Sequence, residues 1–415
     1  MSLWLKVFWR EELRKPEILS PAGNLEKLKF AIEYGADAVY LGGKLFNLRE
    51  RAGNFSVEEM AEGIEYAHLR GKRVYVTLNA FARNRDFEEL KSYVKEIALL
   101  KPDALIVSDL GVLSLVREIA PELDIHISTQ ANVTNYKVVE ILKDLAVKRV
   151  VLARELSIPE IAEIKEKVPD VELEVFVHGA MCMAYSGRCL LSDYLAYRAS
   201  NKGACSQSCR WKYYIVEEKR PGELYEIEED GKGTYIFNSK DLCALPVLPE
   251  LVRAGVDSFK IEGRVKSAYY VAVVTDVYRK AVDLLFESPQ EFEDFLPFLM
   301  GELKKVSHRP YTLGFLVPEN EEIKQHYESS SYIRDYQFLA FYNGRSWTVR
   351  NRFSVGEEVE LFSPGAKVQK TKVKAILLQD SAESIEEVHP NYEVNISFAE
   401  PVRVTPYTIL RKKKS

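Results

Sequence analysis

Short apolar runs alternate with amphipathic stretches along the first two thirds of the chain. Each run is rich in β-branched and other apolar residues and ends in polar residues or glycine. Near-continuous apolar strands separated by helices are typical of a parallel sheet covered on both faces. Eight runs are predicted strands: EILSPAG from Glu17, DAVYLGG from Asp37, RVYVTLN from Arg73, DALIVSD from Asp103, DIHISTQ from Asp124, KRVVLARE from Lys148, ELEVFVHG from Glu172 and DSFKIEGR from Asp257.

The segments between these runs carry helix signals. Ser56 with Glu59 and Ser157 with Glu160 have the spacing of capping boxes. Glycines at 35, 71 and 255 stand where a helix should end. Eight βα units suit a closed (β/α)8 barrel, a TIM-like fold, better than an open doubly wound sheet, which is the alternative. In such barrels the catalytic residues lie at the C-terminal ends of the strands, which together form the mouth of the barrel.

The connection after the seventh strand is much longer than an ordinary crossover, with about 80 residues between Gly179 and the eighth strand. Within it, WKYYIVEEKRPGELYEIEEDGKGTYIFNS alternates in polarity around Pro-Gly and Asp-Gly turns, which predicts a hairpin. After an amphipathic helix from about Lys266 to Phe286, the pattern changes near Thr312 to Tyr332.

Beyond that change lie short predicted strands in FLAFYNGRSWTVRN, EEVELFSP, TKVKAILLQD and NYEVNISF, separated by turn residues. They predict a small C-terminal β-barrel, and the RKKKS tail is expected to be a solvated end. The predicted domains are a barrel over 15–300 with a cysteine-rich insertion over 180–245, a linker over 301–332, and the small barrel over 333–415.

Composition and charge narrow the possible partners. The 415 residues are 47% hydrophobic, which is normal for a globular core, and the formal net charge is −5. This charge argues against a general polyanion binder but allows a local basic surface for RNA. Charged residues interrupt the apolar residues of the N-terminal segment, so we expect a cytoplasmic protein without a membrane partner.

All five cysteines fall within 62 residues of the insertion region, at positions 182, 189, 205, 209 and 243. Clustered thiols in a cytosolic chain more often serve metal or redox chemistry than disulfides. Four thiolates can hold a 4Fe–4S cluster or a structural zinc ion, and spacing alone leaves both open. Structural zinc sites usually contain two closely spaced cysteine pairs, whereas here only Cys205 and Cys209 are close, so the spacing favours an iron–sulfur cluster. Cys205 and Cys209 could begin the C-x3-C-x2-C motif of radical enzymes. The position of the third cysteine is Lys212, so this interpretation fails.

The segment EVFVHGAMCMAYSGRCLLS, from Glu174 to Ser192, resembles the signature of the U32 family of collagenase-like peptidases. The resemblance extends through NKGACSQSCRW, SKDLC and FKIEGRVKSAYYV and covers about residues 17 to 290. It implies a barrel-like catalytic domain with a cluster-binding insertion. The chain most resembles the branch that hydroxylates wobble uridine of transfer RNA to 5-hydroxyuridine with prephenate.

The resemblance also implies site residues. Its cluster ligands correspond to Cys182, Cys189, Cys205 and Cys243, with the choice of Cys205 over Cys209 left open. The implied cofactor is a 4Fe–4S cluster and the implied co-substrate is prephenate, with transfer RNA as the partner. Association with a second U32 chain, of the same or another kind, is also expected.

Polar residues that follow the predicted strands are the candidates for chemistry. His178, Glu155 and Glu262 are candidate catalytic residues, while Arg154 and Arg264 could bind a dicarboxylate such as prephenate through guanidinium contacts. The arginines and glutamates could equally form ion pairs that close the mouth, and His178 could simply satisfy a strand-end carbonyl.

Basic and aromatic residues interleave in the insertion, a combination that suits phosphates and splayed bases. The predicted RNA contacts are Arg188, Lys202, Arg210 and Trp211, accompanied by Tyr185, Tyr194 and Tyr197. Surface solvation and packing explain many of these residues as well.

Two other functions remain open from the sequence. The family name suggests a peptidase, for which Cys182 with His178 is the local nucleophile and base pair, although no third group orients them. A non-catalytic iron–sulfur scaffold of a hydroxylation complex is the other alternative.

Overall fold

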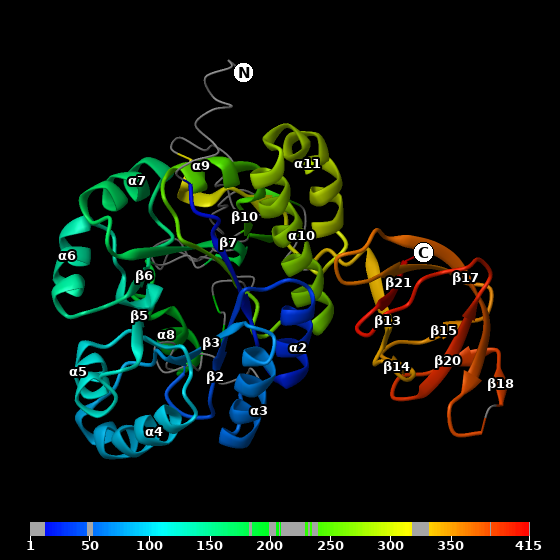
Figure 1. The fold of residues 1–415 in the computed structure, drawn as a ribbon, viewed down its shortest axis with the longest axis horizontal. Helices are drawn as coiled ribbons and strands as arrows, with labels where there is room; N and C mark the ends of the chain where they lie inside the picture. Colours follow the sequence, from blue (N-terminus) through cyan, green and yellow to red (C-terminus); the bar gives the residue numbers. More distant parts are fainter. Residues whose placement is uncertain are drawn as a thin grey trace, which may run out of the picture.

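The computed structural model describes residues 13–47, 53–181, 185–198, 205–206, 208, 229–230, 233–234, 240–317, 332–381 and 383–414. Within these ranges no helix is long and apolar enough to cross a membrane. Two bodies are visible, a large barrel ringed by helices and a smaller all-β body beside it (Figure 1).

The large body is a closed barrel of parallel strands. The order is β1-β2-β3-β4-β5-β6-β7, and β11 pairs with both β1 and β7, so no edge remains between them. The predicted barrel is therefore confirmed. Its strands are β1 Glu17–Pro21, β2 Ala38–Gly42, β3 Arg73–Leu78, β4 Ala104–Val107, β5 Asp124–Ile127, β6 Arg149–Val151, β7 Glu172–Ala180 and β11 Ser258–Ile261.

Helices cover the outside of the barrel. The capping box at Ser56 and Glu59 is formed as predicted, and Gly35, Gly71 and Gly255 have positive φ where their helices end. The helices are α2 Leu25–Glu33, α3 Val57–His68, α4 Phe87–Leu99, α5 Leu110–Ile119, α6 Tyr136–Asp144, α7 Ile158–Lys167, α8 Leu191–Ala196, α9 Leu248–Arg253, α10 Ala268–Glu287 and α11 Pro289–Leu303.

Charged side chains fill the barrel interior toward the N-terminal ends of the strands, opposite the mouth. Glu17 of β1 contacts Arg149 of β6 at 2.6 Å, and these strands are not neighbours, so the contact crosses the barrel. Arg149 also contacts Glu174 at 3.1 Å, whose other oxygen binds Lys260 at 2.6 Å. Tyr75 donates a hydrogen bond to Glu17 at 2.7 Å. We call Glu17, Tyr75, Arg149, Glu174 and Lys260 the floor network.

Two short strands extend the sheet beyond the barrel. β10 Asp241–Cys243 pairs antiparallel with the end of β7, and β12 Tyr311–Thr312 pairs parallel with β10. Both come from segments outside the βα rhythm, one from the insertion and one from the predicted linker. Of the predicted hairpin, the described part is two short strands, β8 Glu229–Asp230 and β9 Gly233–Thr234, which pair antiparallel. The rest of that hairpin lies outside the described residues.

The smaller body is a closed antiparallel barrel, as predicted. Its order is β16-β21-β13-β14-β20-β17, with β17 pairing back to β16, and apolar side chains including Leu339, Trp347 and Val394 fill its core. Its strands are β13 Tyr336–Tyr342, β14 Trp347–Val349, β15 Phe353–Ser354, β16 Glu358–Phe362, β17 Gln369–Leu378, β18 Ser384–Ile385, β19 Glu387–Val388, β20 Glu393–Phe398 and β21 Ile409–Lys413.

The prediction that the basic tail is a solvated end is wrong for Arg411. This residue lies on β21, between β13 and β16, and its side chain is fully buried where the two bodies meet. Its guanidinium contacts Glu302 of α11 at 2.6 Å and Glu360 of β16 at 2.9 Å. A run of like charges suggests a solvated end only when nothing packs on it, and here both carboxylates come from segments distant in sequence.

Helix α10 is also more buried than an amphipathic surface helix. Every residue from Ala268 to Tyr278 is buried, because the barrel, α11 and neighbouring segments cover all sides of its first half. Contacts between the two bodies continue at Tyr34 of α2, whose ring stacks on Phe362 and whose hydroxyl donates to the Phe362 carbonyl at 2.8 Å. Such contacts fix the small barrel to the helical side of the large one.

Candidate active site at the barrel mouth

Two predicted residues, Arg154 and Glu262, meet at the C-terminal mouth. Arg154 follows β6 and Glu262 follows β11, and their side chains lie 3.6 Å apart at 10% and 13% exposure. Arg154 also donates to the Ala180 carbonyl at 2.8 Å, and its guanidinium lies 3.9 Å from the ring centre of Phe176. Within the described part of the chain, its buried Nε has no hydrogen-bond partner. One hydrogen-bond donor of Arg154 is thus buried and unsatisfied at the mouth.

Arg264, the second predicted arginine, is nearly fully buried at the same end of the barrel. It donates to the Thr77 hydroxyl and to the Asn47 side-chain oxygen, each at 3.3 Å. A Cβ at Gly42 would lie 2.3 Å from its Nη1, so glycine is needed to admit the guanidinium. Sequence reasoning missed Thr77 and Asn47, since one lies within a strand and the other in a polar loop without a motif.

Glu155 holds the connection that follows β7. Its carboxylate accepts hydrogen bonds from the Ser186 backbone N–H at 2.9 Å and from the Ser186 hydroxyl at 3.2 Å. The next residue, Gly187, has φ of +76°, and a Cβ there would lie 2.0 Å from the Gln130 carbonyl oxygen. The segment that carries Cys189 is thus fastened to the ends of β5 and β6. These contacts give Glu155 an anchoring role.

His178, a candidate catalytic residue, lies on the outer face of β7. The register of β7 and β11 shifts before Ile261, which pairs with His178, and the imidazole faces Tyr278 and Tyr270 of α10 and also Tyr311. Burial, helped by the charges of Lys266 and His308, lowers the pKa of His178 to about 3. A neutral imidazole packed among tyrosines is a weak base, so these contacts favour the packing role.

The described cysteines supply part of the predicted ligand set. The segments that carry Cys189 and Cys205 are joined, because the Ser206 N–H donates to the Ser192 hydroxyl at 2.9 Å. Both of these cysteines are half-buried. Cys182 and Cys209 lie outside the described residues. Within the described ranges, no three His, Cys, Asp or Glu side chains are grouped to hold a metal ion.

Among the three described cysteines, Cys243 fits the ligand set least well. Its thiol is buried on the outer face of the sheet, 3.9 Å from the sulfur of Met300 and 4.0 Å from the Tyr278 hydroxyl. Burial raises the pKa of this thiol to about 11. Since a metal ligand has to be a thiolate, binding there would require the thiol to lose its proton and leave these contacts.

Of the predicted RNA contacts, the structure describes Arg188, which is exposed on the segment after β7. Lys202, Arg210 and Trp211 lie outside the described residues.

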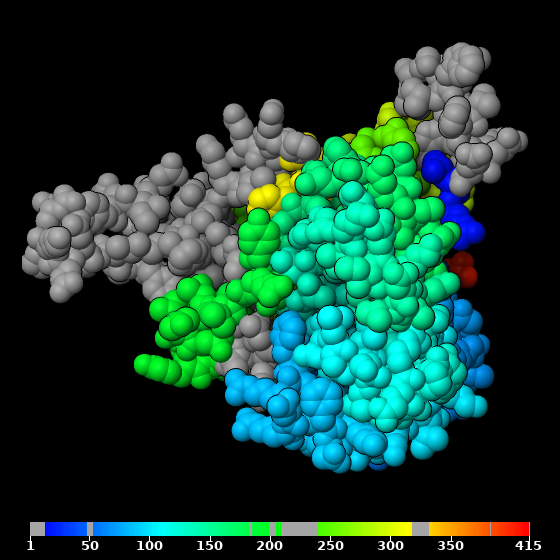
Figure 2. All heavy atoms as spheres, turned by 90° about the vertical axis from the view of Figure 1, so that its left-hand side faces the viewer, coloured from blue at the N-terminus to red at the C-terminus, as the bar shows by residue number. Residues whose placement is uncertain are grey.

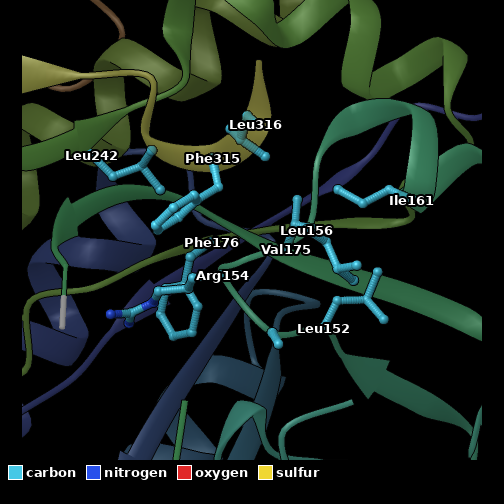
Figure 3. A pocket seen from close by; sticks show the side chains of 10 residues that line it. Leu152, Arg154, Leu156, Ile161, Val175, Phe176, Leu242, Phe315 and Leu316 are labelled. Carbon is cyan, nitrogen blue, oxygen red and sulfur yellow. The ribbon is translucent and has the colours of Figure 1, made fainter. Parts of the chain in front are cut away.

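An apolar pocket opens beside Arg154. It lies between the ends of β6 and β7 and the segment before residue 317, with Phe176, Leu242 and Phe315 among its lining residues. Figure 3 shows Arg154 and Phe176 next to each other, with Phe315 above them and Leu156 and Ile161 to the right. The pocket is only about the size of a water molecule, so its apolar walls border the guanidinium but do not themselves hold a ring.

Family models match both bodies of the chain. The peptidase family U32 model matches residues 23–326, and the peptidase family U32 C-terminal domain model matches residues 334–411. The chain belongs to peptidase family U32. The family resemblance drawn from the cysteine signature is thereby confirmed.

Curated relatives cover nearly the whole length of this U32 chain. It is 40% identical to tRNA hydroxylation protein P1 of Bacillus subtilis over 412 residues, 97% of this chain and 96% of the relative. It is 40% identical to tRNA hydroxylation protein P of Escherichia coli, over 86% of this chain and 88% of that one. The 23S rRNA 5-hydroxycytidine C2501 synthase of Escherichia coli is 37% identical over 74% of this chain and 43% of its own.

Proposed function

We propose that this U32 protein is an enzyme that hydroxylates transfer RNA, converting wobble uridine to 5-hydroxyuridine with prephenate as co-substrate. One observation carries the proposal: relatives named for tRNA hydroxylation align at 40% identity over both bodies, not over a shared barrel alone. The relative named as a 5-hydroxycytidine synthase supports the same class of reaction, hydroxylation of a pyrimidine ring in RNA.

The mouth offers groups suited to a dicarboxylate with a six-membered ring. We propose that the Nε of Arg154 and the guanidinium of Arg264 receive the two carboxylates, since charge-assisted guanidinium contacts are strong in a site with little water. Glu262 would orient Arg154 across their 3.6 Å contact, and the Phe176 ring beneath Arg154 would pack on the ring of the ligand.

We further propose an iron–sulfur cluster held by Cys182, Cys189, Cys205 and Cys243. The support is the clustering of all five cysteines in one region and the hydrogen bonds that join the Cys189 and Cys205 segments. Such a cluster supplies one-electron redox chemistry. The position of Cys243 is the weakest part of this ligand set, and Cys209 and structural zinc are the alternatives.

The ligand set is tested by iron and sulfide analysis of protein purified without oxygen. We expect about four irons per chain in the parent and a marked loss of iron for Cys189→Ser. The control Ser384→Ala, at an exposed serine of the small barrel, should change the iron content little. If Cys243→Ser keeps its iron while Cys209→Ser loses it, Cys209 replaces Cys243 in the set. A parent that binds zinc and no iron would contradict the iron–sulfur proposal.

The peptidase alternative receives little support from the described residues. Its base would be His178, but that imidazole is buried among tyrosines with its pKa lowered to about 3. A general base works best when its pKa is near the working pH.

The decisive experiment for the function is nucleoside analysis by mass spectrometry. Transfer RNA from a bacterial strain that lacks its own tRNA hydroxylation proteins should regain 5-hydroxyuridine derivatives when this chain is expressed, and lose them again when prephenate synthesis is blocked. Unchanged nucleosides together with soluble, iron-loaded protein would count against the proposal. Light scattering of the purified protein measures its mass in solution and tests the expected association with a second U32 chain.

A further inference from the structure

Large apolar side chains are concentrated on the surface of one short segment, residues 185–198. Tyr185 is 61% exposed, Tyr194 is 78% exposed and Tyr197 is 96% exposed, and Leu190 and Leu195 are exposed as well. In profile, the bright green spheres around α8 project from the side of the barrel that carries the mouth (Figure 2). Exposed apolar patches of this kind mark binding surfaces.

Three exposed side chains lie on α8 or at its two ends. Tyr194 is within the helix, Leu190 is its N-terminal cap and Tyr197 is its C-terminal cap. Tyr197 ends the helix with φ of 52°, in the left-handed region where glycine is favoured. A tyrosine in this conformation costs about 1 kcal/mol or more and, being exposed, contributes no packing in return. Its ring is therefore free of packing within the described residues and is open to contact with a ligand.

Residues 185–198 are attached to the strand ends at the mouth. Glu155, which follows β6, binds Ser186, and Gly187 fits closely against the Gln130 carbonyl. On the other side of α8, the Ser192 hydroxyl is 2.9 Å from the Ser206 hydroxyl. The exposed rings are thus fixed to the same strand ends that position Arg154 and are not carried on a free loop.

We propose that Tyr185, Tyr194 and Tyr197 form a stacking surface for the unpaired nucleotides that flank the modified base, with Arg188 contacting phosphate. This inference rests on the proposed function. Aromatic rings favour bases over other occupants because every base has a flat face for stacking. The segment carries two arginines and one aspartate, which suits a polyanion although the whole chain is acidic. An enzyme that acts on a ring atom of a base also has to support that base outside its normal stack.

Binding of a fluorescent anticodon stem–loop RNA to the full chain, isolated without oxygen, tests the surface. For Tyr194→Ala and Tyr197→Ala we expect the Kd to rise about five- to a hundredfold each, the range for loss of one base–aromatic stack. Tyr194→Phe and Tyr197→Phe should bind like the parent, because they keep the ring. The control is Tyr392→Ala, which removes a half-exposed tyrosine from the small barrel. Arg188→Gln should reduce the salt dependence of binding, whereas the tyrosine variants should leave it unchanged.

The outcomes separate this surface from the proposed function. If the parent restores 5-hydroxyuridine but both alanine variants bind RNA as tightly as the parent, the stacking surface is wrong and the function stands. Equal losses in the phenylalanine and alanine variants also overturn stacking. A change in oligomeric mass with unchanged RNA affinity would assign this surface to a protein partner. If the parent neither binds the RNA nor restores the nucleoside, the proposed function itself fails.

Discussion

The floor and the mouth of the large barrel both bury charged side chains, but they bind them in different ways. In the floor network, Arg149 contacts Glu17 at 2.6 Å and Glu174 at 3.1 Å, and Lys260 completes Glu174 at 2.6 Å. At the mouth, Arg154 is held by a backbone carbonyl and a more distant Glu262, and its Nε has no partner in the described part of the chain.

The electrostatics of the floor agree with a closed structural network. Burial alone would raise the pKa of Glu17, but Arg149, Arg73 and the Tyr75 hydroxyl together outweigh it and hold that pKa below its usual range. His126, buried against Tyr75, has its pKa lowered by burial and by Arg149 and Lys260. The comparison teaches that buried charge alone does not mark an active site. Arg154 differs from Arg149 in two ways: its Nε has no partner among the described residues, and it lies at the mouth.

Removing the central charge of the floor should have the largest effect. Arg149→Met takes one of two cations from each buried carboxylate, because Glu17 keeps Arg73 and Glu174 keeps Lys260. We therefore expect the free energy of unfolding to fall by about 3 kcal/mol, the lower end of the cost of breaking a buried ion pair. Denaturant titration measures this fall. The control is Lys148→Met, whose half-exposed side chain lies 3.8 Å from Glu172 and should contribute about 0–1 kcal/mol. Equal, small changes in both variants would show that the floor network is not closed.

The corresponding change at the mouth should affect activity more than stability. Arg154→Met keeps the packing on Phe176 but removes the donors, and a lost charge-assisted hydrogen bond of about 1.5–3 kcal/mol lowers the rate roughly ten- to hundredfold. We expect 5-hydroxyuridine formation to fall by that factor, while the free energy of unfolding falls by only about 1–2 kcal/mol because the Ala180 carbonyl and Glu262 lose a partner. A stability loss as large as that of Arg149→Met would erase the contrast between mouth and floor.

His178 sharpens the comparison because it lies near the mouth but faces outward. Its folded-state pKa of about 3 is below the ordinary value of 6.5, so the unfolded chain takes up the proton first and stability falls as pH drops below 6.5. This one group should remove about 2 kcal/mol between pH 7 and pH 5. The free energy of unfolding of His178→Gln should fall by about 2 kcal/mol less than that of the parent between pH 7 and pH 5. The control His389→Gln, at an exposed histidine, should lose as much as the parent.

The smallest expected effect concerns the anchor of the segment after β7. Glu155→Gln keeps the shape but weakens two hydrogen bonds to Ser186, which we expect to cost about 1 kcal/mol. Hydroxylation should fall less than in Arg154→Met, with the KM for RNA rising more than kcat falls. A complete loss of activity with normal RNA binding would instead make Glu155 a catalytic residue.

The barrel was predictable because each βα unit is encoded locally. Strand runs such as that from Arg73, the capping box at Ser56 and the terminal glycines depend on neighbouring residues, and the structure confirms them. The family was predictable for a similar reason, since its signature is one continuous segment from Glu174 to Ser192. Arg154, Glu262 and Arg264 could be proposed for the mouth because each follows a strand.

The sequence by itself determined the two barrels, the family and the residues that reach the mouth. Only the tertiary structure decided what those residues do there. It turned His178 outward through a register shift, buried Arg411 against Glu302 and Glu360, and closed the floor network across strands that are not neighbours. Local patterns depend on residues a few positions apart, whereas the partner of a buried charge is set by which distant segments meet in the fold.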